Sequence, residues 1–234
     1  MAPDKVRSER VARLAQRQVL RWEIQHPHTR AEPTRPCVAL SRLPGTGGAE
    51  IGRLVAETLD YGCFDGEIVD QIASELGVDH WMLRGLDERV RSRIDRLVAD
   101  AFGAQRVPEG VYFQHLARVV ATLAERGRAV IVGRGAPFLV PPERGLRVLL
   151  IAPRERRIAR YAEVMQLPAE RARVELDRAD AQRAEFVRAR FGARQDDPLL
   201  YDLTLNTGTL SFELAADLIV EALRRRFPHP RPGA

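Results

Sequence analysis

Lysine is almost absent from this chain: of its 37 basic residues only Lys5 is a lysine, and the rest are arginine. A phosphate bound by the fold must therefore be neutralised by arginine or by a metal ion. Arginine suits this task because it stays charged and donates two parallel hydrogen bonds to a phosphate. The net charge of +5 favours anionic partners. Acidic residues are interspersed and no basic-aromatic stripe appears, so we do not expect nucleic acid binding.

Long hydrophobic runs are also missing, which excludes a membrane-spanning segment. Residues 1–18 are charged throughout and contain no apolar signal core, so we expect a cytoplasmic protein. The two cysteines, Cys37 and Cys63, lie in or beside predicted buried strands and are expected to be small core residues rather than a disulfide or metal pair. The five histidines show no metal-ligand spacing, and no metal site is predicted.

A glycine loop is the most informative feature that is present. Cys37–Ser41 is a short apolar run typical of a buried strand, Gly45–Gly48 follows as a loop, and residues 49–59 have the pattern of an amphipathic helix. Such a turn directs backbone N–H groups and the positive end of a helix dipole at a phosphate. The alternative is a tight turn that needs glycine for steric reasons only. The residues predicted to hold nucleotide phosphates are Ser41, Arg42, Gly45, Thr46, Gly47, Gly48 and Ala49.

The loop lacks the two residues that usually end a phosphate loop. Where Gly-Lys-Ser/Thr is expected, Gly48 and Ala49 replace the lysine and the hydroxyl residue. Ser41 or Thr46 can offer a hydroxyl instead, and we expect Arg42 to fold over the loop and supply part of the missing charge.

Strands and helices alternate along the rest of the chain, which predicts a mostly parallel, doubly wound α/β sheet. Further strands are expected at residues 61–64, 129–132, 146–151 and 201–206, and helices at 68–76, 88–102, 109–126, 158–191 with a break at Pro168, and 212–226. Residues 3–25 form a predicted N-terminal helix. It can pack on the domain, pair with a second subunit in a homo-oligomer, or bind a partner, and the sequence does not separate these roles.

Two polar residues follow predicted strands directly, and strand ends are where such sheets bind ligands. Asp65 is placed to orient an acceptor hydroxyl or a Mg²⁺-bound water, or equally to cap the helix that begins near Glu67. Arg134 lies between two glycines, which favours phosphate capture over a surface salt bridge.

The stretch from Arg154 to Arg194 is rich in arginine, and its Asp180 and Arg183 share a helix face. Phosphoryl transfer needs neutralised charge and exclusion of water, and a mobile helical pair that closes over the phosphates supplies both. The alternative is an exposed, salt-bridged helix pair, which we expect most of these arginines to form.

With these residues in view, the chain resembles the cytidylate-kinase-like family of P-loop proteins. The resemblance covers residues 37–223 and lies in the motifs SRLPGTGGAEIG, FDGEIVDQIA, VIVGRGA, DRADAQR and YDLTLNT. It implies a nucleoside-monophosphate-kinase fold, a three-layer α/β/α domain with a five-stranded sheet and helical acceptor-binding and lid regions. The implied domain spans 36–227 with its lid at 153–195, after an extension at 1–35 and before a flexible tail at 228–234.

The resemblance also implies roles for individual residues. Gly45–Ala49 would be the donor-phosphate loop, Asp65 and Arg134 acceptor-site residues, and Arg157, Asp180 and Arg183 lid residues. The implied catalytic set is Asp65, Arg157, Asp180 and Arg183.

Four positions depart from the cytidylate kinase pattern: Gly48 and Ala49 in the loop, Gly135 where an aspartate is usual, and Leu176 where an arginine is usual. Two hypotheses follow. The first is an enzyme that uses ATP and Mg²⁺ to phosphorylate a small phosphorylated acceptor, a nucleoside monophosphate such as CMP or dCMP. The second is a nucleotide-binding or regulatory module of the same fold in which chemistry is weak or lost.

Overall fold

The fold is built on a five-stranded parallel sheet with the order β2-β3-β1-β4-β5. The computed structural model describes residues 13–15, 17–24, 35–75, 88–102 and 111–228. The strands are β1 (Cys37–Arg42), β2 (Gly62–Phe64), β3 (Ala129–Val132), β4 (Gly145–Ile151) and β5 (Leu203–Asn206). All five predicted strands are present, and the α/β fold class is confirmed.

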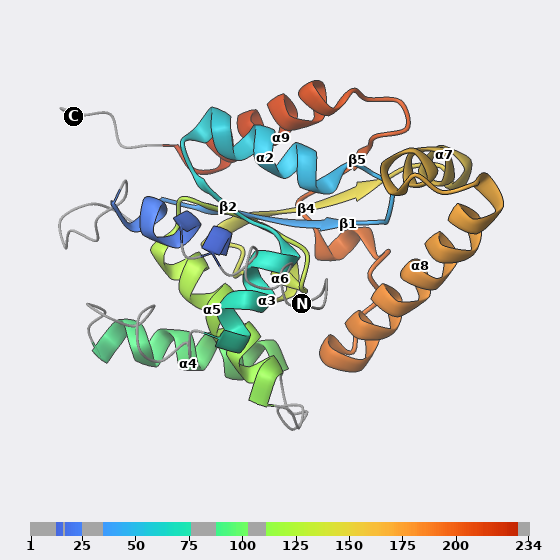
Figure 1. Ribbon diagram of the computed structural model, residues 1–234. Coiled ribbons are helices and arrows are strands. Elements are labelled where there is room, and N and C mark those ends of the chain that lie inside the picture. The colour runs from blue at the N-terminus through green and yellow to red at the C-terminus, as the bar shows by residue number, and fades with distance from the viewer. Residues whose placement is uncertain (1–12, 16, 25–34, 76–87, 103–110, 229–234) are drawn as a thin grey trace.

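Helices cover both faces of this sheet (Figure 1). α2 and α9 lie on one face and α3 to α6 on the other, while α7 and α8 form an arm beyond the carboxyl ends of the strands. The helices are α2 (Gly48–Leu59), α3 (Gly66–Glu75), α4 (Glu88–Phe102), α5 (Val111–Arg126), α6 (Ala136–Leu139), α7 (Arg154–Met165), α8 (Ala169–Phe191) and α9 (Phe212–Arg226), with a 3-10 turn η1 (Pro198–Leu200). The short α6 and η1 were not predicted.

Strand β1 shows why a continuous apolar run forms the centre of this sheet. Val38 and Leu40 pack on the α2–α9 side, whereas Cys37 and Ala39 pack on the opposite side, and all four are fully buried. Successive side chains of a strand point to opposite faces, so a strand covered on both faces needs apolar residues at every position.

The order of the strands fixes where a ligand can bind. β1 lies between β3 and β4, so the connection after β1 and the connection after β3 leave the sheet in opposite directions. In parallel sheets of this kind the crevice at such a switch point, at the carboxyl ends of the strands, is the ligand site. The glycine loop after β1 and the turn after β3 meet there.

The α7–α8 arm is held together by its own small core. Leu176 is fully buried and packs with Ile158 and Ala172 between the two helices. Pro168 is the N-cap of α8, which places the break between the helices at the predicted proline. Leu176 therefore serves packing at a position where the family resemblance predicts an arginine.

The N-terminal helix packs on the domain, the first of its three predicted roles. Helical residues are described at 13–15 and 17–24, and Trp22 is only 3% exposed. Its indole Nε1 donates to the Arg128 carbonyl at 2.9 Å, and its ring lies edge-to-face against Phe64. Residues 1–12, 16 and 25–34 of the predicted extension at 1–35, and residues 229–234 of the predicted tail at 228–234, lie outside the described residues.

Both cysteines are free thiols, and burial raises the pKa of each to about 12. They therefore act as packing residues at neutral pH. Within the described parts of the chain, no helix has the length and apolar character needed to cross a bilayer.

Candidate functional site

The glycine loop connects β1 to α2 through two left-handed glycines. Gly45 has φ +79° and Gly47 has φ +77°, a region that side chains rarely adopt. A Cβ on Gly45 would run into the carbonyl of Arg157, and a Cβ on Gly47 would run into the ring of Phe212. Glycine is therefore required here by backbone conformation and by close packing together.

The loop presents the start of α2 with no side-chain cap. Gly47 is the N-cap residue and has no side chain with which to cap the helix, and no side chain among the described residues is seen to accept a hydrogen bond from the first N–H groups. Uncapped N–H groups at a helix start, together with the helix dipole, favour a bound anion. The geometry is compatible with both predicted roles of the loop, a phosphate site and a turn that needs glycine for steric reasons.

The two predicted hydroxyls of this region are both engaged within the protein. Thr46 is 1% exposed, and its Oγ1 donates to the Leu43 carbonyl at 2.8 Å. Thr207, just beyond β5, donates to the Thr46 carbonyl at 3.0 Å. The Thr46 side chain therefore braces the loop, whereas Ser41 lines the neighbouring cavity and lies 3.4 Å from Gln195 Nε2.

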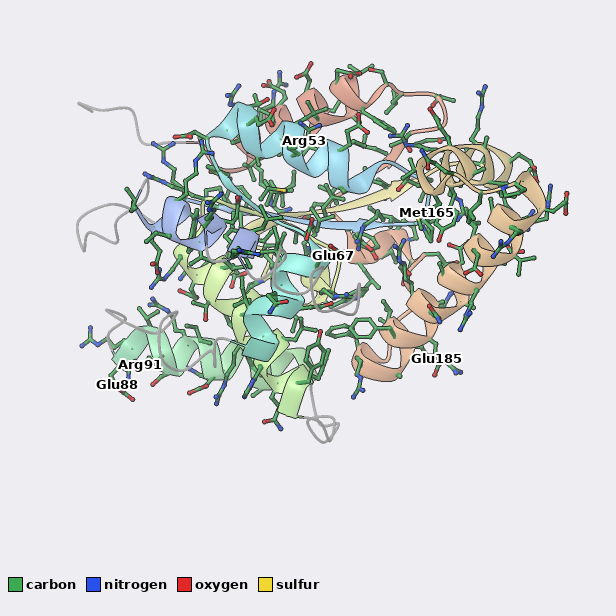
Figure 2. All side chains as sticks on the ribbon, in the orientation of Figure 1. Arg53, Glu67, Glu88, Arg91, Met165 and Glu185 are labelled. Carbon is green, nitrogen blue, oxygen red and sulfur yellow. The ribbon has the colours of Figure 1, made fainter. Side chains whose placement is uncertain are left out.

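A cavity of about 550 Å³ lies beside the loop at the carboxyl ends of β1 and β3, and we call it the rim cavity. Its wall comes from the end of β1, the start of α3, the turn after β3, and one face of α8. The lining residues are Ser41, Arg42, Ala49, Asp65, Gly66, Glu67, Gly133, Arg134, Gly135, Phe138, Ala179, Gln182, Arg183, Phe186, Val187 and Gln195. Figure 2 shows Glu67 at the strand ends, across from the arm that carries Met165 and Glu185.

Three arginines from three separate elements converge on the rim cavity: Arg42, Arg134 and Arg183. Burial lowers the pKa of Arg42 to about 9, and repulsion by Arg183 and Arg134 adds to this shift against the attraction of Asp65. Burial also lowers the pKa of Arg183, whose Nη1 donates to the Arg42 carbonyl at 3.2 Å. The cluster is an excess of positive charge that a bound anion would relieve.

Asp65 performs the predicted capping role and also faces the cavity. Its Oδ1 accepts a hydrogen bond from the Ile68 N–H at 3.0 Å, and the residue is part of the cavity wall. The two roles predicted for Asp65 are therefore compatible in one geometry, because the cap uses one carboxylate oxygen.

Arg134 is oriented by a carboxylate on α3. Its Nη2 forms an ion pair with Asp70, whose other oxygen accepts a hydrogen bond from the Tyr112 hydroxyl at 2.5 Å. Arg134 itself has φ +51°, and Gly135 after it would meet the Phe191 ring if it carried a Cβ. Gly135 thus serves close packing of α8 over this turn, whereas Gly133 leaves room for the guanidinium of Arg42.

Arg157 and Asp180 pair with each other and lie outside the wall of the rim cavity. Arg157 Nη1 donates to both Asp180 oxygens, at 2.7 and 2.9 Å, and Nε donates to the Ala152 carbonyl at 3.2 Å. Since the Arg157 carbonyl also abuts Gly45, this pair joins α7, α8 and the glycine loop. Of the four predicted catalytic residues, the structure brings Asp65 and Arg183 to the cavity and uses the other two as a brace.

Sequence reasoning missed several residues of this site. Phe138 and Phe186 contribute aromatic rings to the cavity wall, and Gln195 lines it from the loop after α8. Phe186 lies one helical turn after Arg183, so its presence on the same face could have been predicted. The Asp70 that orients Arg134 is 64 residues away in sequence and carries no comparable signal.

Comparison with known proteins supports this picture. The model of a family described as the cytidylate kinase-like family matches residues 37–209. A cytidylate kinase of Aeropyrum pernix is 29% identical over 192 residues, which span 80% of this chain and 98% of that protein. The crystal structure of an uncharacterised protein from Eubacterium ventriosum superposes with a TM-score of 0.64 at 18% identity, over 82% of this chain and 99% of that one.

The structural likeness agrees with the predicted fold, and the family match covers the phosphate loop, the turn after β3, the arm and β5. It also confirms the coarser part of the predicted function, a phosphotransferase of the kinase type. The chain belongs to the cytidylate kinase-like family.

Proposed function

We propose that this protein transfers the γ-phosphoryl group of ATP to the phosphate of a nucleoside monophosphate, with CMP or dCMP as the preferred acceptor. The observation that carries the proposal is the rim cavity, where Arg42, Arg134 and Arg183 converge beside the uncapped start of α2. Phosphoryl transfer is catalysed mainly by positioning and by neutralising charge on the transferred group. An arginine cluster at the mouth of a phosphate loop supplies both.

The lining of the cavity supports an acceptor that carries a phosphate and a flat base. The wall combines the three arginines with the aromatic rings of Phe138 and Phe186 and the side-chain amide of Gln182. Aromatic rings stack on bases, and an amide can hydrogen-bond to a base edge. A volume of about 550 Å³ is within the range of small-ligand sites.

The residues of the loop fit the phosphates of ATP. Successive N–H groups from Gly45 to Ala49 would hold the phosphates, and the arm formed by α7 and α8 would exclude water from them. No other side chain of the described residues competes for the first N–H groups of α2.

Mg²⁺ fits the same place through Asp65. In phosphoryl-transfer sites this ion is bound by one or two carboxylates together with phosphate oxygens and water, and Asp65 is a carboxylate of the cavity wall. When bound, the ion neutralises charge that develops on the transferred group. Ala49 provides no hydroxyl, so Asp65 would be the main protein group that orients the ion.

The second candidate function, a nucleotide-binding module without turnover, is favoured by a different observation. Gly48 and Ala49 stand where the usual motif has the lysine and the hydroxyl residue, while the hydroxyls of Thr46 and Thr207 hydrogen-bond to the loop and its preceding turn. Such a protein would bind ATP and leave the acceptor unchanged.

One assay separates the two functions. Purified protein is incubated with ATP, Mg²⁺ and a panel of nucleoside monophosphates and sugar-like acceptors, and ADP is followed. The kinase proposal predicts acceptor-dependent ADP formation, fastest with CMP or dCMP. Binding of ATP without turnover of any acceptor supports the second candidate and contradicts the first.

A further inference from the structure

Two glycines of the site make room for one arginine. A Cβ on Gly48 would lie 2.7 Å from Arg42 Cγ and 2.9 Å from Arg42 Cβ. Gly133 has φ +87°, and a Cβ there would coincide with Arg42 Nη1. The Arg42 side chain therefore runs beneath the first residue of α2, and its guanidinium ends against the turn after β3.

The contact between Arg42 and Gly48 can be compared with the residue order of the usual phosphate-loop motif. A phosphate loop places a glycine, four further residues, and then Gly-Lys-Ser/Thr. With Gly47 as the second glycine, the first belongs at position 42 and the lysine at position 48. This chain has arginine at 42 and glycine at 48, so glycine and cation have exchanged places.

We propose that Arg42 is the loop cation of this protein, relocated from position 48, and that it contacts the transferred phosphoryl group from the acceptor side of the loop. The inference rests on the proposed function and deepens it. It explains why Gly48 carries no side chain: the space beside it holds the Arg42 stem. It explains Gly133 in the same way, because the guanidinium occupies the space that a side chain would need.

The charge of Arg42 supports a role with an anion. Among the described residues no carboxylate forms an ion pair with its guanidinium, and Asp65, the carboxylate whose charge raises its pKa, also caps α3. Arg42 shares the cavity with Arg134 and Arg183, which repel it. A side chain placed only to fill space beneath α2 would not need this charge.

The exchange of glycine and cation predicts that the effect of a substitution at position 48 depends on the residue at position 42. Gly48→Lys alone forces a side chain onto the Arg42 stem. Gly48→Lys combined with Arg42→Ala removes that stem and places a lysine at its usual position after Gly47. We compare Arg42→Ala, Gly48→Lys, the double variant, and Arg53→Ala as the control. Arg53 is an arginine of α2 whose side chain is 61% exposed. Its replacement by alanine removes one positive charge at a position that does not line the rim cavity.

Two readouts are measured on protein whose fold is verified by circular dichroism. The first is calorimetric binding of inorganic triphosphate without metal or acceptor, and the second is ADP formation with ATP, Mg²⁺ and CMP. For Arg42→Ala we expect triphosphate binding at least about tenfold weaker and turnover down by roughly a hundredfold or more. We expect the double variant to recover at least about tenfold of that loss, with Arg53→Ala unchanged.

The proposal is overturned if folded Arg42→Ala binds triphosphate within about twofold of the unmodified protein. It is also overturned if the folded double variant is no better than Arg42→Ala, because position 48 is then not the place of the missing cation. The binding readout needs no acceptor. An unmodified protein that turns nothing over, but whose triphosphate binding depends on Arg42, contradicts the proposed function and supports this inference.

Discussion

Replacing Arg42 by methionine should stabilise the fold while weakening anion binding. Methionine keeps an unbranched apolar stem against Gly48 and removes a cation that burial and two neighbouring arginines disfavour. A residue retained for function at a cost in stability is expected at a binding site.

The size of the stabilisation expected for Arg42→Met follows from the pKa of Arg42. The pKa of Arg42 falls from the ordinary range of arginine to about 9, and a change of one in pKa corresponds to about 1.4 kcal/mol, so the upper bound on the cost of holding the charge is about 5 kcal/mol. Because Arg42 faces a cavity that water can enter, we discount this to about 1–2 kcal/mol. For a chain of this size such a gain raises Tm by roughly 3–6 °C.

The pH dependence has a definite sign. Arginine is charged in the folded and unfolded states below about pH 9, so the whole cost is present there and the gain from Arg42→Met is constant between pH 6 and 8. Above about pH 9 the folded protein loses the Arg42 proton while the unfolded chain keeps it. The unfolded state then binds more protons, so the stability cost of the buried charge declines. Inorganic phosphate should stabilise the unmodified protein more than the variant, since only the former retains the full cation cluster.

Thermal unfolding in phosphate-free buffer measures this prediction, with Arg53→Met as the matched control at an exposed position, where a change within about 0.5 kcal/mol is expected. An Arg42→Met variant that melts several degrees below the unmodified protein would refute the reasoning, because it would mean that the charge is compensated and stabilises the fold.

Three further substitutions test the framework around the site. Asp180→Ala leaves the buried Arg157 without its partner and should cost about 2–3 kcal/mol in urea unfolding, and a loss below about 0.5 kcal/mol would contradict the brace. Trp22→Ala removes a buried indole and its hydrogen bond and should cost about 3 kcal/mol, whereas an unchanged midpoint would mean that the N-terminal helix does not pack on the domain. Asp202→Asn should cost about 1–2 kcal/mol at pH 7, because two arginines hold the pKa of Asp202 at about 2 against the opposing effect of burial. This cost is fully present above about pH 4 and disappears as the pH falls towards 2, so a pH-independent difference between the two proteins would argue against the assignment.

Much of the fold was predictable because its strands are buried on both faces. Residues Cys37–Leu40 and Ala129–Val132 are apolar throughout, and the structure places each run in an inner strand of the sheet. The predicted strand at 201–206 begins at Leu203 instead, because Asp202 before it binds Arg147 and ends the apolar pattern. Short elements such as α6 and η1 have too few residues for a periodic signal.

The residues themselves predicted the candidate site best where a polar side chain follows a strand end directly. Asp65 and Arg134 were predicted in this way and Arg183 through the family resemblance, and all three line the rim cavity. The partnership of Arg157 with Asp180 was not, since it depends on how α8 folds back on α7. The direction of the Arg42 side chain was equally hidden, because the contacts with Gly48 and Gly133 exist only in the folded chain.

The central claim is that the arginine-lined cavity beside a lysine-free phosphate loop supports phosphoryl transfer. The most direct test is the rate of ADP formation by the purified protein with ATP and Mg²⁺, with and without each nucleoside monophosphate. The account predicts acceptor-dependent turnover, fastest with CMP or dCMP. Tight ATP binding with no ADP formed above the acceptor-free rate for any acceptor would contradict it.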